Sequence, residues 1–356
     1  MRKLQILTAS EQVAAHLRQE ILRGIWTGTM PGEDRLVARL GVGRDTLKTA
    51  VKLLEQEGWL VPQGKGRRRL IVLPESAATP QLRISILAYE KADRQSIHGE
   101  GLLHALQEEG HAVHFAEKDL HDLKMDPRRV ARFVGDHPAD AWVIIAGSSA
   151  VLQWFSEQPF PSFAIFGRSS GLNMAGASPR KSPAMIEGLR RLVELGHRRI
   201  VLLVREERRK PHPALAEAEF LEEMERLGLP TGPYNFPDWE DSKDGFLRCL
   251  DRLFEHTPPT ALFIIEPKLY TAALQHLAQR GIAAPRDVSL VCDELAPSFE
   301  WCEPSVSHIR WKYAPLLRRV AKWASHVARG KPDTRLSYFS AKFIEGGSIG
   351  PVPKGK

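Results

Sequence analysis

Cysteine and long apolar runs are both scarce in this sequence of 356 residues. Its three cysteines, Cys249, Cys292 and Cys302, are too few for a disulfide framework and too widely spaced for a zinc site. No segment approaches the ~20 consecutive apolar residues that a membrane span needs, and residues 1–12 hold too short an apolar stretch for a signal peptide. We therefore expect a cytoplasmic protein that has no membrane partner.

The motifs of the common enzyme classes are also missing. The sequence contains no G-x-S-x-G, H-E-x-x-H, G-x-G-x-x-G or Walker A motif. His111, His114 and His121 flank a predicted strand at spacings of three and seven residues, which would point them in different directions, so we expect no metal site. The sequence predicts a protein without catalytic residues or a cofactor. An enzyme built on an α/β fold is the alternative, and activity on candidate sugars would reveal it.

Positive charge is concentrated at one end of the chain. Residues 1–73 hold 13 Lys and Arg against 7 Asp and Glu, a balance of +6, whereas residues 74–356 hold 37 against 36, a balance of +1. A small basic end beside a nearly neutral body indicates a nucleic-acid-binding module attached to another domain. Residues 74–81, PESAATPQ, have the composition of a linker. We therefore expect a DNA-binding domain over 1–73, a linker over 74–81 and a second domain over 82–356.

The spacing of apolar residues in the basic end predicts three helices and a hairpin. Residues 8–24 form an amphipathic pattern, and two shorter helical patterns over 33–40 and 44–57 are separated by the turn Gly-Val-Gly. Two helices joined by a three-residue turn are the helix-turn-helix pattern, in which the second helix reads DNA with its N-terminal residues. Residues 58–73 predict a hairpin with the basic tip QGKGRRR. Together these elements indicate a winged helix-turn-helix.

This end of the chain resembles the GntR family of winged helix-turn-helix regulators over about residues 8–73. The segment GIWTGTMPGEDRLVA matches the family's turn and second helix, and VGRDTLKTAVKLLEQEG matches its recognition helix, followed by a G-x-G wing. The resemblance implies a double-stranded operator DNA as partner. It implies DNA contacts from Arg35, Arg44, Thr46, Lys48, Gly64, Lys65 and Gly66.

Two positions at the start of the recognition helix depart from this family pattern. Gly43 stands where the family usually has a serine, which removes one hydroxyl that would contact phosphate. Asp45 places an acidic side chain near the expected DNA surface. It would either accept a hydrogen bond from a cytosine amino group or help to cap the helix.

Beyond the linker, short apolar runs alternate with segments of helical length. This alternation predicts an α/β domain with parallel sheets covered on both faces. The apolar runs are 82–89, 112–117, 141–147, 162–167, 198–204, 260–266 and 288–294, and the helical segments are 97–110, 126–136, 182–195, 214–228, 242–256 and 268–281. Residues 207–210, ERRK, are expected to form a solvated loop.

The body resembles the effector-binding domain of the LacI/GalR family. Three segments carry the resemblance: LVELGHRRIVLLV at 192–204, PPTALFIIEPKLYTAALQHLAQRGIAAPRDVSLVCDE at 258–294, and the closing segment 331–350. The resemblance implies a two-lobed, type I periplasmic-binding-protein-like fold. A GntR-type head joined to such a body is the architecture of regulators similar to the arabinose repressor.

In an α/β fold of this kind a ligand lies at the carboxyl ends of the strands. The candidates that follow the apolar runs are Tyr89, Ser148, Arg168, Arg205, Glu266 and Asp293. The resemblance places Asp293 where the family's pocket aspartate lies. However, residues 211–224 lack the arginine with which the family usually holds sugar hydroxyls, so the pocket is expected to take a modified or charged saccharide, or to have lost its ligand.

From these patterns we expect a homodimeric transcriptional repressor of carbohydrate-utilisation genes, controlled by a small-molecule effector of saccharide type. The dimer is expected because two-fold protein symmetry usually matches a palindromic operator. The alternative is a ligand-independent regulator whose body only dimerises.

Overall fold

The computed structural model describes residues 8–22, 25–64, 66–72 and 81–353. It divides into two compact units, of which the first comprises residues 1–177 and 317–337 and the second comprises 178–316 and 338–356. Among the described residues, no helix is long and apolar enough to cross a membrane. The expected linker 74–81 lies almost wholly outside the described residues.

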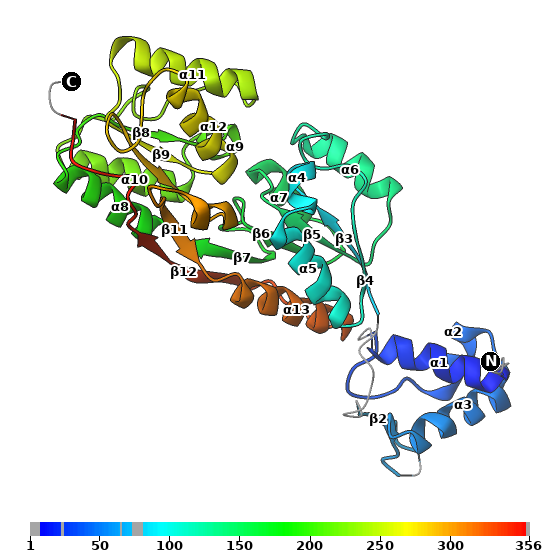
Figure 1. Ribbon diagram of the computed structural model, residues 1–356. Coiled ribbons are helices and arrows are strands. Elements are labelled where there is room, and N and C mark those ends of the chain that lie inside the picture. Colours follow the sequence, from blue (N-terminus) through cyan, green and yellow to red (C-terminus); the bar gives the residue numbers. More distant parts are fainter. Residues whose placement is uncertain (1–7, 23–24, 65, 73–80, 354–356) are drawn as a thin grey trace, which may run out of the picture. The chain divides into compact units, whose positions relative to one another are not determined.

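The basic end of the chain folds as three helices followed by a two-stranded hairpin (Figure 1, blue). The helices are α1 (Ala9–Leu22), α2 (Glu33–Leu40) and α3 (Arg44–Gln56), and the strands are β1 (Leu60–Val61) and β2 (Leu70–Ile71). The apolar positions that predicted the helices meet in one core that includes Leu17, Leu36, Leu47, Leu54 and Trp59. The predicted winged helix-turn-helix is confirmed.

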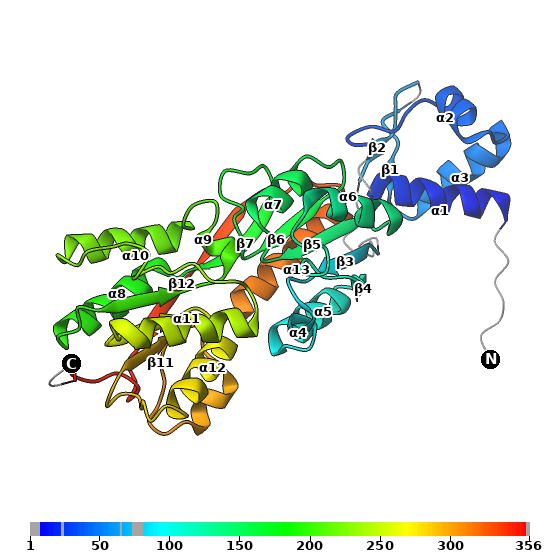
Figure 2. The same cartoon turned by 90° about the horizontal axis from the view of Figure 1, so that it is seen from above.

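The rest of the first unit is a parallel sheet with helices on both faces. The strand order is β4-β3-β5-β6-β7. Figure 2 shows α6 and α7 on one face of this sheet and α5 and α13 on the other. The strands are β3 (Arg83–Leu87), β4 (Ala112–Phe115), β5 (Ala141–Ile145), β6 (Ser162–Ile165) and β7 (Ala175–Arg180), and the helices are α4 (Lys91–Arg94), α5 (Ile97–Glu108), α6 (Pro127–Asp136), α7 (Ser149–Ser156) and α13 (Ala314–Ala328).

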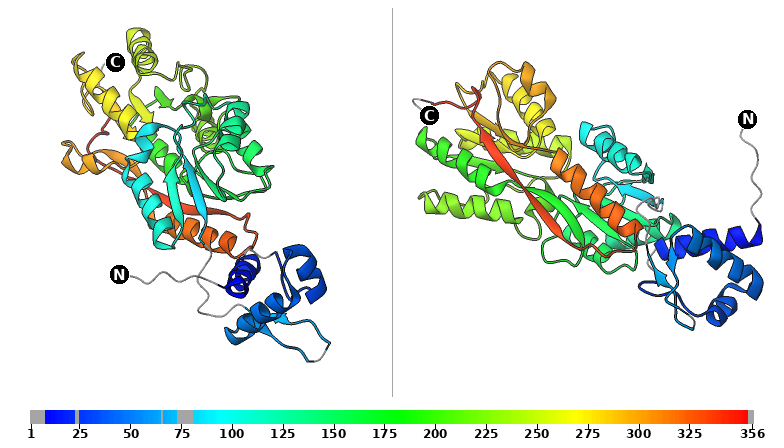
Figure 3. Two further views of the ribbon diagram at one scale, coloured as in Figure 1. Left: turned by 90° about the vertical axis from the view of Figure 1, so that its right-hand side faces the viewer. Right: turned by 90° about the horizontal axis from the view of Figure 1, so that it is seen from below.

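The second unit repeats this design. Its strand order is β8-β9-β10-β11-β12, with only β12 antiparallel to its neighbour. Helices α8 and α10 pack together, as do α11 and α12, and the nine-residue β12 is the long red strand in Figure 3. The strands are β8 (Ile200–Leu203), β9 (Ala261–Ile264), β10 (Ser289–Cys292), β11 (Ser307–Trp311) and β12 (Leu336–Ile344), and the helical elements are α8 (Ser182–Glu194), α9 (Glu206–Arg209), α10 (Leu215–Arg226), α11 (Lys243–His256), α12 (Pro267–Ala278) and the 3-10 helix η1 (Pro297–Trp301).

The structure confirms the predicted parallel sheets and corrects several local expectations. Strands β8, β9 and β10 are buried along their whole length, as strands covered on both faces must be. Helix α7 and strands β7 and β11 lie outside the predicted segments. Residues 207–210 are not a solvated loop, because 206–209 form helix α9 and the side chain of Arg209 is buried. Its charge is matched by a carboxylate, which the local sequence could not show.

Candidate DNA-binding and effector-binding sites

The start of helix α3 presents basic side chains to solvent. Arg44 and Lys48 are exposed, and Thr46 is half-buried. Arg44 Nη2 lies 2.7 Å from Asp34 Oδ1 on α2, and the two side chains are 71% and 84% exposed. An ion pair that exposed contributes little stability. Arg44 can therefore exchange Asp34 for a phosphate or a base edge at small cost.

Helix α2 contributes a second exposed basic surface. Arg35 is exposed and lines a small hollow of about 170 Å³ with Trp26, Leu36 and Arg39. The guanidinium of Arg39 lies 5.4 Å from the centre of the Trp26 ring, a cation–π distance. The same ring packs in the core of the winged helix-turn-helix. Arg35 thus lies on the same helix as Asp34, the partner of Arg44.

The wing is tied to both helices of the helix-turn-helix. Arg69, next to β2, pairs with Glu55 of α3 and lies 3.3 Å from Glu33 of α2. Burial lowers the pKa of Arg69, but the bonds and charges of Glu55 and Glu33 outweigh it and the pKa is raised. Arg69 is therefore permanently charged and fixes the base of the hairpin against the recognition helix.

Glycine is required at the tip of this wing. Gly64 and Gly66 have φ of 105° and 80°, a conformation that side chains other than glycine rarely adopt. Lys65, the predicted contact between them, lies outside the described residues. The two glycines let the backbone turn sharply, so that it can approach a DNA strand closely.

Asp45 does not cap helix α3 through a hydrogen bond. The N-cap residue is Gly43, and the helix has no side-chain cap. Asp45 lies exposed in the first turn, where its charge interacts favourably with the helix dipole. The proposed contact with a cytosine amino group stays a prediction.

In the second unit, two of the predicted ligand residues pair with each other. Arg205 and Glu266 follow the neighbouring parallel strands β8 and β9, whose carboxyl ends share one edge. Arg205 Nε and Nη2 lie 3.0 and 2.8 Å from the two carboxylate oxygens of Glu266, and Nη1 lies 2.6 Å from Asp241 Oδ1. The Arg205 side chain is only 10% exposed, so this arrangement is held rigidly.

Asp293 follows β10 at the same edge and is buried. Its Oδ2 accepts a hydrogen bond from Lys181 Nζ at 3.3 Å, and Lys181 also lies 3.6 Å from Glu294. Its Oδ1 has no hydrogen-bond partner among the described residues. Burial raises the pKa of Asp293 to about 6, against the opposing effect of Lys181 and Arg208. This carboxylate oxygen is a buried acceptor, so a ligand hydroxyl or amine reaches it only if the side chains around it move apart.

We call the charged side chains around Arg205, Glu266 and Asp293 the charged cluster. Four of its further members were not among the predicted residues. Lys181 holds Asp293, Asp241 holds Arg205, and Arg208 pairs with the fully buried Glu217. They come from the segment before α8, the loop before α11, and helices α9 and α10. Their charge was the available signal, but no local spacing links them.

The first unit carries the other three predicted ligand residues at one sheet edge. Tyr89, Ser148 and Arg168 follow β3, β5 and β6, which are neighbours in the sheet. Tyr89 is buried, and the Ser148 hydroxyl caps helix α7 by accepting the Val151 N–H at 3.4 Å. The Ser148 hydroxyl therefore has a structural role, and its contact with a ligand stays a prediction.

Backbone strain marks the same edge of the first unit. Ala146 and Phe166, the residues directly after β5 and β6, have φ of 53° and 60°. This left-handed conformation costs about 1 kcal/mol or more for residues other than glycine, and it often occurs at binding sites. Nothing in the sequence predicted this backbone conformation.

Comparison with protein families gives two matches along the chain. Residues 9–68 match the family "Bacterial regulatory proteins, gntR family". Residues 189–349 match the family "Periplasmic binding protein-like domain". The chain joins a gntR-family domain to a periplasmic binding protein-like domain. We refer below to these parts as the gntR head and the binding-protein-like body. The search of curated proteins gave no match.

Solved structures of LacI-type regulators share the fold of the body. One from Bifidobacterium animalis is 18% identical, covers 75% of this chain and 99% of its own, and has a TM-score of 0.60. One from Enterococcus faecium, with bound ribose, is 16% identical over 76% and 99% of the two chains, with a TM-score of 0.58. A complex of the transcriptional regulator CelR with cellobiose is 16% identical over 90% and 100%, with a TM-score of 0.60.

The residues that the structure describes contain no group of three His, Cys, Asp or Glu side chains placed to hold a metal ion. Cys292 is buried, and burial raises the pKa of its thiol, so it is not a reactive thiolate.

Proposed function

We propose that the protein is a cytoplasmic, homodimeric transcriptional repressor that binds operator DNA through the gntR head and a small molecule through the binding-protein-like body. The exposed basic start of α3 carries the DNA-binding part of the proposal. Arg44 and Lys48 stand in solvent on a helix whose other face, with Leu47 and Leu54, is buried in the head's core. A recognition helix needs this division between a buried face and a polar reading face.

In this proposal the residues of the head have two roles. Arg44 and Lys48 at the start of α3, with Thr46, contact base edges in the major groove, while Arg35 and the Gly64–Gly66 wing tip contact the phosphate backbone. Lys65 at the tip supplies a further positive charge. Phosphate contacts hold the head in register, and base contacts supply the sequence specificity.

The effector is proposed to bind at the charged edge of the second unit. Asp293 accepts a donor through its unpartnered oxygen, and Arg205 and Glu266 present a rigid pair of charged groups beside it. We keep Tyr89, Ser148 and Arg168 as candidate ligand residues of the first unit. Relatives of this fold were solved with ribose and with cellobiose, which supports a saccharide and, with it, a role in carbohydrate use.

The first experiment is footprinting of the purified full-length protein on genomic DNA at two stated salt concentrations. Discrete palindromic sites are expected, and the genes beside them would indicate the effector class. Diffuse binding that vanishes at the higher salt would contradict the proposal, since binding without sequence specificity rests on phosphate contacts alone.

One observation favours the ligand-independent alternative. The basic side chains of the charged cluster, Lys181, Arg205 and Arg208, each already pair with a carboxylate of the same unit. Thermal unfolding with ribose, cellobiose and related sugars separates the two functions. A ligand at 100 times its Kd stabilises the folded state by about 2.7 kcal/mol, whereas a body that only dimerises shows no shift.

A further inference from the structure

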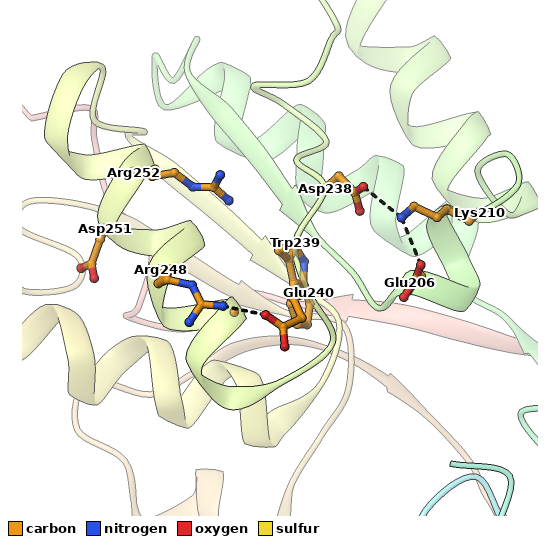
Figure 4. Close-up of a pocket in the computed structure, with 9 residues that line it drawn as sticks. Glu206, Lys210, Asp238, Trp239, Glu240, Arg248, Asp251 and Arg252 are labelled. Atoms are coloured by element: carbon orange, nitrogen blue, oxygen red, sulfur yellow. Dashed lines mark hydrogen bonds and ion pairs between the residues drawn. The ribbon is translucent and has the colours of Figure 1, made fainter. Parts of the chain in front are cut away.

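Several charged side chains that line a hollow in the second unit pair with one another. This hollow has a volume of about 630 Å³ and lies between helices α9 and α11 (Figure 4). Lys210 Nζ lies 3.0 Å from both Glu206 and Asp238, and Arg248 lies 2.6 Å from Glu240. These charges are matched within the unit, so they require no outside partner.

Helix α13 and the loop behind it differ from this hollow, because they carry an excess of positive charge. Residues 318–335 hold six Lys and Arg against one Asp, a balance of +5, whereas the rest of 74–356 holds 31 against 35, a balance of −4. The near neutrality of the body therefore conceals one basic segment. We call its exposed cations the basic face; they are Arg318, Lys322, Arg329, Lys331 and Arg335.

Helix α13, orange in Figure 3, directs basic side chains to solvent because its opposite side is apolar. Trp323 and Ala324 are buried, and the Trp323 ring lies 5.1 Å from the ring of Phe163 on β6. Arg318 and Lys322 are four residues apart, so they lie on one side of the helix, and both are exposed. The packing of α13 thereby fixes which of its residues face water.

The one carboxylate of this segment does not neutralise the basic face. Asp333 accepts two hydrogen bonds from Arg319, at 2.8 and 3.1 Å, and both side chains are only 6% exposed. Lys322, Lys331 and Arg335 form no ion pair with any other described residue. Their charges are therefore unmatched at the surface.

Two contacts place this segment at the edge of the first unit's sheet where the strands begin. The Ser325 hydroxyl donates a hydrogen bond to Oε2 of Glu109, an exposed residue that ends α5 just before β4. The Arg335 carbonyl accepts the Gly176 N–H at 3.2 Å, at the start of β7. Strands β3 to β7 are all parallel, so both contacts lie at the same edge.

The chain from the gntR head enters the body at this same edge. Leu82 directly precedes β3, and its carbonyl accepts the Ala112 N–H at 2.8 Å, at the start of β4. The described residues of the head end at 72 and those of the body begin at 81. Nine residues of chain span at most ~30 Å. A duplex held by the head is therefore tethered close to this edge.

We propose that the basic face contacts the phosphate backbone of DNA that flanks the site bound by the gntR head. The proposal rests on DNA binding by the head and adds a second contact, from the body, that does not depend on sequence. Duplex DNA carries one negative charge per ~1.7 Å of its axis. Exposed cations with no exposed carboxylate in their own segment match such a row of charges, and binding releases the counterions of the phosphates.

Mobility shifts of the full-length protein on two duplexes test the proposal. One duplex carries a footprinted palindrome with flanking DNA on both sides, and the other is trimmed to the palindrome. The wild type should bind the flanked duplex about tenfold more tightly, because only that duplex reaches the basic face. Failure to bind either duplex would contradict DNA binding by the head, whereas equal affinity for the two would overturn the role of the basic face alone.

A double variant and a matched control locate the contact. Lys331→Ala combined with Arg335→Ala should remove the advantage of the flanked duplex and lower the salt dependence by about two phosphate contacts, with the trimmed duplex bound as before. Lys91→Ala removes an exposed cation that follows β3, at the opposite edge of the same sheet, and should bind as the wild type does. Unchanged salt dependence in the double variant, or an equal loss in the control, would overturn the proposal.

A random-sequence duplex of the same length gives the same test when footprinting finds no palindrome, because phosphate contacts require no particular sequence. The double variant should again show the lower salt dependence. Identical salt dependence of variant and wild type on this duplex would likewise overturn the proposal.

Discussion

Basic side chains are used in opposite ways in the gntR head and in the second unit of the body. In the head, Arg44 is 71% exposed and its partner Asp34 is 84% exposed. In the body, the Arg205 side chain is 10% exposed and binds two carboxylates. The exposed cation keeps its hydration and is available to an external phosphate, whereas the buried one is already committed within its own unit. The difference shows that exposure, and not residue type, decides which arginines are available to an outside partner.

The largest expected effect is on the stability of the body, where the arginine is buried. Arg205→Ala leaves Glu266 and Asp241 without their shared cation at a largely buried position, and should lower the free energy of unfolding by about 3 kcal/mol. Arg44→Ala should change it by no more than about 0.5 kcal/mol, since exposed pairs contribute little. Denaturant unfolding of both variants measures the two values. Equal losses would mean that exposure does not separate the two arginines.

A second prediction concerns the buried carboxylate Asp293. Its pKa is raised to about 6, so the folded state holds a proton that the unfolded state releases, and wild-type stability falls as pH rises from about 4 to 6. Asp293→Asn removes this loss. The stability of the variant relative to the wild type should therefore increase by about 2 kcal/mol across that interval. Unfolding at several pH values checks this. A constant difference would contradict the raised pKa.

A third prediction concerns DNA binding by the exposed basic side chains of the head. Arg44→Ala and Lys48→Ala should each weaken binding to a footprinted site about tenfold, or ~1.4 kcal/mol. Arg35→Ala should instead act on all sequences alike and reduce the salt dependence by about one phosphate contact. Mobility shifts at several salt concentrations measure both effects. Arg286→Ala, an exposed arginine of the body, is the control and should bind normally.

The smallest expected effect is at the turn before the recognition helix. Gly43→Ser supplies the missing cap at a residue with φ of −65°, and should stabilise the head by a few tenths of a kcal/mol. Gly41→Ser, two residues earlier, should destabilise it, because Gly41 has φ of 63°. Thermal unfolding of the two variants compares them directly. A shift of the same sign in both would show that the backbone conformation of this turn does not control the outcome.

Much of the fold was predictable because its signals are local. The 3.6-residue period of the head's apolar positions predicted its helices. The apolar runs 198–204, 260–266 and 288–294 enclose β8, β9 and β10, each with one or two extra residues at either end. Strand β7 escaped prediction because its sequence, AGASPR, holds glycine, proline and serine, and β11 because SHIRW mixes polar and apolar residues. Strand β7 pairs with β6, and β11 lies between β10 and β12, so neighbouring strands and tertiary burial override weak propensity in both.

The candidate sites show the same division between features set by local sequence and features set by tertiary contacts. The sequence by itself determined the order of the domains, the exposed basic start of the recognition helix, and the positions of Arg205, Glu266 and Asp293 just past their strands. Only the tertiary structure decided which charges meet, because Arg205 and Glu266 are 61 residues apart and Lys181 and Asp293 are 112 residues apart. Local periodicity depends on neighbours within one or two turns of chain, whereas an ion pair depends on which distant segments pack together and on how much water they exclude.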